Sequence, residues 1–304
     1  MVDAHRLLVL RKVAQAGSFA GATAVLRQTP SAVSQQIAAL ERACGVVVVH
    51  RSTRGVTLTP AGQVLLSAAD AIDAELAVAE RLIAEFKDRG PASLTVMTFP
   101  SAGEPLLAPA LAALTDGATA RGTAAEITVV EAEPAETVAA LRAGKADLGI
   151  VYHFHTPRPP RAWSAPGTTY VPLVVDELRL VVPTGHRLAG RSSAALSDIA
   201  DERWINGWGD SGGILDFLAA GAGFRPDVRC RSSDYRFMAA LVGAGIGVCL
   251  VPELALAPSA AIAPLSLDPP ATRFIGAYLP KRQWRNRAAE ELLGALQAQA
   301  RTYR

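Results

Sequence analysis

The pattern of apolar and polar positions is clearest in residues 18 to 40, where it predicts two short helices joined by a tight turn. Ser18 and Thr29 are good N-caps because a hydroxyl accepts a hydrogen bond from an otherwise unpaired backbone N–H, and Pro30 suits the first helical position. The second helix has an apolar stripe at helical spacing, formed by Val33, Ile37 and Leu40. Its opposite face carries short polar side chains, among them Ser31, Ser34 and Gln35. Such a helix can enter the major groove of DNA and place Ser and Gln against base edges.

Residues 46 to 58 predict a hairpin, with a strand, a turn at Arg54-Gly55 and a second short strand. Arg51 and Arg54 would lie on this hairpin, where they can reach phosphates or the minor groove. Residues 1 to 60 contain seven Lys or Arg and two Asp or Glu, a net charge of +5, whereas the whole chain carries +2. The positive charge is therefore concentrated around the helix pair, as nucleic-acid binding requires.

Apolar residues recur every three or four positions between residues 61 and 88, which predicts one long helix that begins after Thr59 and Pro60. The spacing places six of them on one seam, the expected dimerisation residues Leu65, Ala69, Ile72, Leu76, Ala79 and Ile83. Such a helix either packs along its own chain or pairs with the same helix of a second subunit. The pattern alone leaves both alternatives open.

From residue 91 onward, short apolar runs alternate with helical patterns, which predicts parallel sheets covered by helices. The first series has strands at 94–99, 126–130 and 147–151 and helices at 105–114 and 134–143. A second series runs from 178 to 251, and a strand at 273–279 precedes a closing helix at 285–301. This order predicts two α/β lobes, the first of residues 91–163 and 272–304 and the second of residues 164–271, with crossovers near 163–171 and 264–272.

In such a two-lobed domain a small molecule binds between the lobes, at the carboxyl ends of strands and the N-termini of helices. Ser101, Ala102 and Gly103 directly follow the first strand, so their backbone N–H groups and the Ser101 hydroxyl suit a carboxylate effector. An ordinary strand-to-helix turn is the alternative. Further candidates at the edges of the same cleft are Tyr152, Asn206, Trp208, Ser233 and Asp234. Trp208 fits plain core packing equally well.

Catalytic and metal chemistry has little support in the sequence. His153 and His155 have a spacing that could bind a metal, but no Cys or carboxylate cluster completes a site, so neither a metal nor a cofactor is expected. No Walker loop, Gly-x-Ser-x-Gly elbow or zinc-protease motif is present. The three scattered cysteines, Cys44, Cys230 and Cys249, fit a reducing cytosol, with a redox pair of Cys230 and Cys249 as the alternative. Without a signal peptide or an apolar run of about 18 residues or more, we expect a cytoplasmic protein that does not enter the membrane.

The run GSFAGATAVLRQTPSAVSQQIAALERACGV, followed by HRSTRGVTLTPAG, resembles the N-terminal winged helix-turn-helix of LysR-type transcriptional regulators. The resemblance implies an α+β fold with a winged helix-turn-helix DNA-binding domain at 1–60, a linker and dimerisation helix at 61–90 and a two-lobed α/β effector-binding domain of periplasmic-binding-protein type at 91–304. Gln35 departs from the basic residue that is frequent in the family's recognition helix. Because glutamine favours adenine and arginine favours guanine, the resemblance implies no particular operator sequence.

The resemblance also implies a function. It implies a sequence-specific DNA-binding transcription regulator, and not an enzyme, that is controlled by a small-molecule effector and assembles as a homodimer or homotetramer on roughly palindromic double-stranded DNA. It favours pairing of the long helices between subunits. The residues expected to contact DNA are Ser18, Gln28, Thr29, Pro30, Ser31, Ser34, Gln35, Gln36, Arg51, Thr53 and Arg54. The alternative is a soluble small-molecule-binding protein without specific DNA recognition.

Overall fold

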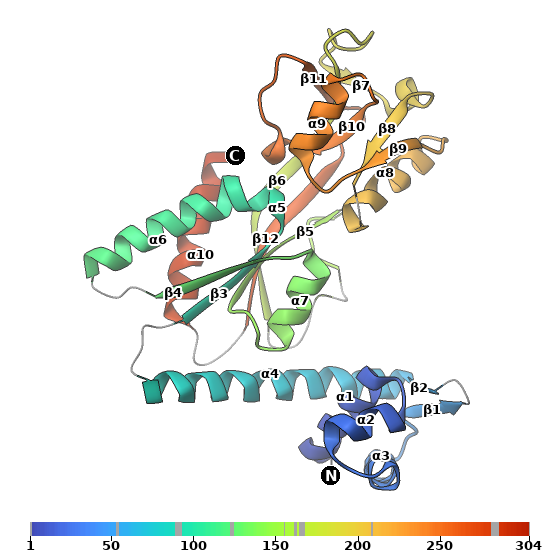
Figure 1. Ribbon diagram of the computed structural model, residues 1–304, viewed down its shortest axis with the longest axis vertical. Coiled ribbons are helices and arrows are strands. Elements are labelled where there is room, and N and C mark those ends of the chain that lie inside the picture. The colour runs from blue at the N-terminus through green and yellow to red at the C-terminus, as the bar shows by residue number, and fades with distance from the viewer. Residues whose placement is uncertain are drawn as a thin grey trace. The chain divides into compact units, whose positions relative to one another are not determined.

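The computed structural model describes residues 2–52, 55–88, 93–121, 125–154, 156–160, 163, 168–207, 209–280 and 286–303. The chain divides into two compact units, one formed mainly by residues 1–90 and the other mainly by residues 91–304. Figure 1 labels their elements. Each unit has its own hydrophobic core. Within the described ranges, no helix is both long enough and apolar enough to cross a membrane.

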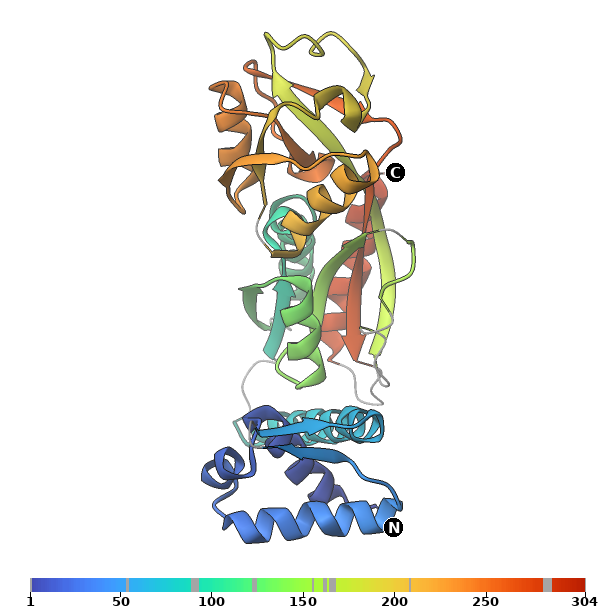
Figure 2. The ribbon, with the colours of Figure 1, turned by 90° about the vertical axis from the view of Figure 1, so that its right-hand side faces the viewer.

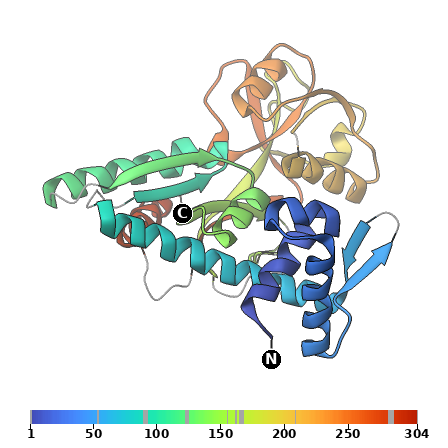
Figure 3. The ribbon, with the colours of Figure 1, turned by 60° about the horizontal axis from the view of Figure 1, so that its bottom comes forward.

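The N-terminal unit contains a winged helix-turn-helix, as expected from the sequence. Its core of apolar side chains, which includes Leu10, Val13, Ile37 and Leu40, lies among the helices α1 (Ala4–Ala16), α2 (Phe19–Leu26) and α3 (Pro30–Cys44). The hydrophobic pattern of residues 18 to 40 did not include α1, which starts after the N-cap Asp3 and ends at Gly17. Strands β1 (Val49–Ser52) and β2 (Gly55–Leu58) pair antiparallel and form the predicted hairpin, the wing (Figure 3).

The long helix α4 (Pro60–Asp88) has the predicted bounds, but the predicted dimer seam divides into two parts. Ala69 is fully buried in the core of the N-terminal unit, and Leu65 and Ile72 pack against the same core. The structure therefore corrects the dimerisation role of these three residues, because their own chain already covers them. Leu76, Ala79 and Ile83 remain exposed.

An ion-pair cluster also fixes the first half of α4 to α1. The Arg11 guanidinium lies 2.7 Å from the Asp70 carboxylate and 2.9 Å from the Asp73 carboxylate. Arg11 itself is buried, with 7% of its surface exposed. The positive charge of Arg11 therefore stabilises the contact between α1 and α4. It is one of the seven basic residues that were counted toward the positive charge around the helix pair.

The main sheet of the C-terminal unit connects, within the described residues, eight strands in the order β4-β3-β5-β12-β6-β11-β7, with β10 paired to β6, and β8 and β9 form a separate parallel pair. Strands β3 (Ser93–Thr98), β4 (Glu126–Glu131) and β5 (Leu148–Phe154) are parallel, as predicted, and β12 (Thr272–Pro280) is antiparallel to β5. The remaining strands are β6 (Thr168–Pro183), β7 (Ser193–Ala194), β8 (Arg203–Asn206), β9 (Asp227–Arg231), β10 (Cys249–Pro252) and β11 (Ile262–Leu267).

Helices cover this sheet. The predicted helix at 105–114 is part of a longer run, in which α5 (Pro100–Ala102) continues through a π-helical turn (Gly103–Leu107) into α6 (Ala108–Arg121). α6 packs beside α10 (Arg287–Ala300), as Figure 1 shows. The others are α7 (Pro134–Arg142), α8 (Gly209–Gly221) and α9 (Tyr235–Gly243), with short 3-10 turns at Leu196–Ile199, Glu253–Ala255 and Arg301–Tyr303.

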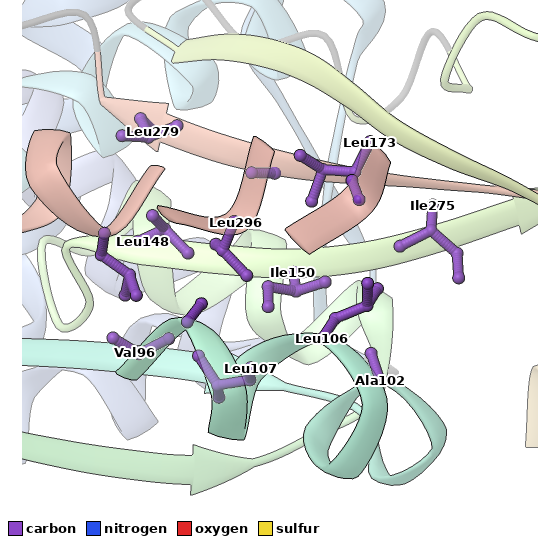
Figure 4. Packing of buried hydrophobic residues seen from close by; sticks show 14 of the residues in the cluster. Val96, Ala102, Leu106, Leu107, Leu148, Ile150, Leu173, Ile275, Leu279 and Leu296 are labelled. Atoms are coloured by element: carbon purple, nitrogen blue, oxygen red, sulfur yellow. The ribbon is translucent and has the colours of Figure 1, made fainter. Parts of the chain in front are cut away.

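Two hydrophobic cores define the two lobes of this unit. The first lobe's core includes Val96, Leu106, Ile150 and Leu296 (Figure 4). The second lobe's core surrounds the fully buried Trp204. Burying a large apolar side chain contributes about 1.5–3 kcal/mol, so each lobe has its own source of stability.

Strand β6 runs from one lobe into the other and can be followed in Figure 2. Its residues Leu173 and Val174 belong to the first core, and Leu178 belongs to the second. The first crossover therefore lies inside a strand, a few residues after the predicted range of 163–171, and the beginning of β6 belongs to the first lobe. The return connection lies between β11 and β12, which overlaps the predicted range of 264–272.

Candidate functional site

The helix-turn-helix is held by two side-chain caps at its predicted positions. The Ser18 Oγ accepts a hydrogen bond from the Gly21 N–H at 3.0 Å, and the Thr29 Oγ1 accepts one from the Ala32 N–H at 3.3 Å. Arg27, in the turn between the helices, adopts a left-handed conformation with φ of 52°. Ser18 and Thr29 therefore have a structural role in addition to any contact with DNA.

The predicted contact residues lie on or near one face of α3. Pro30, Ser31 and Gln35 are exposed, whereas Gln28, Ser34 and Gln36 are half-buried. An exposed serine and glutamine on a rigid helix are donors and acceptors of the kind that read base edges. The predicted contact residues Thr53 and Arg54 lie outside the described residues.

Arg51 connects the wing to α3. Its Nη1 donates to the Ser34 Oγ at 3.0 Å, and its guanidinium lies 4.6 Å from the centre of the Phe19 ring. The cation–π contact and the hydrogen bond keep the wing strand beside the polar face of the helix. Ser34 is therefore already engaged by Arg51, which the sequence pattern did not anticipate.

Several residues of the quoted motif stabilise the junction between α3, the wing and α4. The Glu41 Oε1 accepts hydrogen bonds from the Val48 N–H at 2.9 Å and the Val49 N–H at 3.4 Å. The Thr59 hydroxyl donates to the Val47 carbonyl at 2.9 Å. At Gly62, a side-chain Cβ would lie only 2.1 Å from the Val48 carbonyl oxygen, so the helix can approach the wing this closely only with glycine.

The second candidate site is a cleft of about 650 Å³ between the two lobes of the C-terminal unit. It lies after the carboxyl ends of β3, β4 and β10 and at the N-terminus of α9, and of these positions the sequence predicted the one after β3 and the one at α9. The residues that line it are Pro100, Ser101, Glu104, Pro105, Glu131, Ser233, Asp234, Tyr235, Arg236, Leu254, Ala255, Leu256, Ala257 and Pro258. Its volume is typical of a small-molecule site.

Ser101 does line the cleft, but residues 101–103 do not form the predicted carboxylate cradle. The Ser101 Oγ accepts a hydrogen bond from the Arg273 Nη1 at 2.9 Å. The Ala102 N–H donates to the Phe99 carbonyl, and the Gly103 N–H donates to the Pro100 carbonyl. Ala102 is fully buried. The Ala102 and Gly103 N–H groups are therefore already used inside the fold, whereas the Ser101 hydroxyl accepts its hydrogen bond and keeps its own hydrogen for donation.

Among the other predicted effector residues, Ser233 and Asp234 line the cleft, whereas Tyr152 and Asn206 are buried and are not part of its lining. The Tyr152 hydroxyl donates to the Glu133 Oε2 at 2.9 Å. Burial, followed by the neighbouring Glu133 carboxylate, raises the pKa of Tyr152. The Asn206 Oδ1 accepts from the Gly207 N–H at 2.8 Å, and Trp208 lies outside the described residues.

A buried ion pair lies next to the cleft. Arg273 is 1% exposed, and its Nε donates to the Asp176 Oδ2 at 2.7 Å. The Asp176 Oδ1 accepts from the Leu254 N–H, so this pair joins β6, β12 and the loop after β10. Because Asp176 neutralises it, Arg273 is not a free cation for a ligand.

Sequence reasoning missed several ionisable and aromatic residues of the lining. Glu131 ends strand β4 and lines the cleft. Ligands of such folds bind at the carboxyl ends of strands, and this argument, which selected the residues after β3, also applies to Glu131. Tyr235 and Arg236 begin α9 directly after the predicted Asp234, which caps that helix through the Arg236 and Phe237 N–H groups. No sequence signal pointed to Leu254–Pro258, since only the fold brings this loop to the cleft.

The histidines and cysteines form no second site in the described chain. Over those residues there is no cluster of three or more His, Cys, Asp or Glu suited to a metal, and His155 lies outside them. All three cysteines are free thiols. Cys249 is buried, and this burial raises the pKa of its thiol, which keeps it protonated and unreactive.

Comparison with known proteins identifies both units. The model of the bacterial regulatory helix-turn-helix protein of the lysR family matches residues 4–63, and the model of the LysR substrate binding domain matches residues 87–301. An uncharacterised HTH-type transcriptional regulator of Mycobacterium tuberculosis is 35% identical over 188 residues, which cover 59% of this chain and 55% of that relative. The chain thus spans about half the length of this curated relative.

Other relatives match over a greater length. A probable hydrogen peroxide-inducible genes activator of Mycobacterium avium is 27% identical over 93% of this chain and 90% of its own length. A cysteine mutant of OxyR from Corynebacterium glutamicum has 25% identity and a TM-score of 0.56, covering 100% of this chain and 93% of that one. Full-length LysG from the same organism has 20% identity and a TM-score of 0.60, over 99% of both chains, which shows a shared fold. With a helix-turn-helix at 4–63 and a substrate binding domain at 87–301, the chain belongs to the LysR family of bacterial regulators.

Proposed function

We propose that the protein regulates transcription by binding a specific, roughly two-fold symmetric DNA site, and that a small molecule in the interlobe cleft controls this binding. The main support for this proposal is the capped helix α3. Its Ser31 and Gln35 are exposed, and they face away from the buried side chains Val33, Ile37 and Leu40. A helix presented in this way fits the major groove. Because the proposed target is chromosomal DNA, we place the protein in the cytoplasm.

The proposed DNA contacts have different tasks. Ser31 and Gln35 contact base edges. Thr29 and Gln36 contact the DNA backbone, and Arg51 anchors the wing. Ser34 joins the first group once DNA competes for its hydrogen bond to Arg51. Pro30, Ser18 and Gln28 set the geometry at the start of the two helices. Thr53 and Arg54, which lie outside the described residues, are proposed to contact phosphates. We propose a binding role and not catalysis, and the family match supports this.

The proposed effector site is the cleft, and the proposed readout is a change in the angle between the lobes. The lobes have separate cores and are joined by β6 and the short β11–β12 connection, an arrangement suited to hinge motion. A ligand shifts such an equilibrium only if it binds one arrangement more tightly than the other.

We further propose that the second half of α4 pairs two subunits. Leu76 and Ile83 are 50% and 54% exposed and, with Ala79 between them, continue the apolar seam beyond the part that the N-terminal unit covers. A symmetric pair of helix-turn-helix domains then requires a roughly symmetric operator. Homotetramers are compatible with the same contact.

The test is to capture fragmented genomic DNA of the source organism on the purified full-length protein at about 150 mM salt, a concentration at which weak non-specific contacts are screened. Recurrent, roughly palindromic fragments are the expected result. Gln35→Ala should change preference at one base pair by about 1–3 kcal/mol. Gln15→Ala, an exposed glutamine on α1, is the matched control and should leave the preference unchanged. Retention without any recurrent site would refute sequence-specific recognition.

A further inference from the structure

The ionisable groups that line the interlobe cleft give it a negative character. Three carboxylates, those of Glu104, Glu131 and Asp234, face one guanidinium, that of Arg236. Arg236 is already engaged, because its Nη2 lies 2.7 and 2.6 Å from the two carboxylate oxygens of Glu104. The described residues of the lining therefore carry a formal charge of −2 at neutral pH, and among them the one cation is already paired.

The groups behind the lining do not reverse this balance. Arg273 is neutralised by Asp176, so its guanidinium is not available to a carboxylate, and its Nη1 donates to the Ser101 Oγ. Burial raises the pKa of Tyr235, at the start of α9, and among the smaller causes the Glu133 and Asp176 carboxylates raise it while Arg273 lowers it. The Tyr235 phenol thus stays neutral and can serve a ligand as a hydrogen-bond partner.

Glu131 is the lining carboxylate best suited to hold a ligand. It is exposed at the carboxyl end of β4, and no described residue pairs with it. Asp234 instead uses its carboxylate to cap α9, and Glu104 is paired with Arg236. A carboxylate that remains unpaired beside a cleft forms short, charge-assisted hydrogen bonds with an ammonium or guanidinium group.

Besides these ionisable groups and the hydroxyls of Ser101, Ser233 and Tyr235, the wall of the cleft is apolar. The apolar residues are Pro100, Pro105 and the loop Leu254–Pro258. These surfaces favour a hydrocarbon stem, whereas the carboxylates favour a positive end.

On this basis we propose that the effector is a cationic small molecule, an amine or guanidine with an apolar stem, whose charged end binds Glu131. This rests on the proposed function of the cleft and replaces the carboxylate class expected from the sequence. The reason for the change is tertiary, since the fold uses the Ala102 and Gly103 N–H groups internally and leaves Glu131 without a partner among the described residues.

The test uses three probes with the same five-carbon stem, n-pentylamine, pentanoate and 1-pentanol, added to the full-length protein at equal ionic strength. Thermal shift and calorimetric titration should show tighter binding of pentylamine than of the other two. Glu131→Gln should weaken pentylamine by roughly 10- to 100-fold, the range for a hydrogen bond to a charged group. Glu126→Gln, at the opposite end of β4, is the matched control and should bind like the unmodified protein.

Three results would overturn the proposal. They are a preference for pentanoate, an equal response to the three probes (including none at all), and a preference for pentylamine that survives Glu131→Gln. Capture of genomic DNA by the same two variants is measured in parallel. If that capture is normal while the probes fail, the effector class is wrong and the proposed DNA-binding function stands.

Discussion

Gly62 offers a sharp test of how the wing is attached to the long helix. It is buried in the first turn of α4, and a Cβ placed on it would lie 2.1 Å from the Val48 carbonyl oxygen and 3.3 Å from the Leu58 Cβ. The same Val48 oxygen accepts a hydrogen bond from the Thr59 N–H at 3.1 Å. Gly62→Ala therefore forces α4 and the wing apart and weakens the hydrogen bond between the Thr59 N–H and the Val48 carbonyl.

The size of the effect follows from three opposing contributions. Overpacking of a tight site costs about 1–3 kcal/mol. Weakening the hydrogen bond between Thr59 and Val48 costs about a further 1 kcal/mol. Alanine regains about 1 kcal/mol because it favours the helical backbone more than glycine does. The expected net loss of local stability is about 1–3 kcal/mol.

Hydrogen exchange read by mass spectrometry is the suitable assay, because it reports each unit separately, whereas all four tryptophans lie beyond residue 160 and leave the N-terminal unit silent in fluorescence. In Gly62→Ala the amides of the wing and of the first turn of α4 should exchange about tenfold to hundredfold faster. Gly294→Ala is the control, since nothing lies within 4 Å of a Cβ at that exposed position of α10. It should slow exchange in α10. Unchanged exchange in Gly62→Ala would refute the packing argument.

Three further predictions concern buried ionisable groups. Arg11→Met should destabilise the N-terminal unit by about 1–3 kcal/mol, because the half-exposed carboxylates of Asp70 and Asp73 lose their partner. The same hydrogen-exchange assay should detect this loss, with Arg42→Met, at an exposed position, as the control. Equal effects of the two substitutions would count against the ion pair. Burial lowers the pKa of His153, so the unfolded chain binds a proton first and stability falls as the pH drops below about 6.5. His153→Gln should flatten the fall in Tm between about pH 7.5 and 5.5, and parallel curves would disprove this. Cys249 should resist alkylation by iodoacetamide in the native protein and react after unfolding, and rapid native labelling would contradict its burial.

Local physics made much of the fold predictable. The caps at Ser18 and Thr29 act within three residues along the chain, so the helix-turn-helix followed from sequence alone. The bounds of α4 followed in the same way from the start at Pro60 and the spacing of apolar residues. The alternation of strands and helices after residue 91 predicted the parallel β3, β4 and β5, because a period of two or 3.6 residues is visible in any short window.

Long-range contacts escaped prediction. Heptad spacing could not distinguish the two parts of the α4 seam. Leu65, Ala69 and Ile72 pack on the core of the N-terminal unit, whereas the second part of the seam stays exposed. Strand β6 begins about ten residues before its clearest apolar run, since its first half is only half-buried against its neighbours. Of the predicted effector residues, Asn206 ends β8 as expected, whereas Tyr152 lies inside β5, which continues to Phe154, and the fold buries both side chains.

The sequence by itself therefore determined the family, the order of the elements and the polar face of α3, since each depends on hydrogen bonds and periodicity within a few residues. Only the tertiary structure decided which charges are free. Arg11 meets Asp70 and Asp73 across 59 or more positions, Arg273 meets Asp176 across 97, and Glu104 meets Arg236 across 132. Such pairings depend on how distant segments are brought together, and they leave Glu131 as the unpaired carboxylate in the cleft among the described residues.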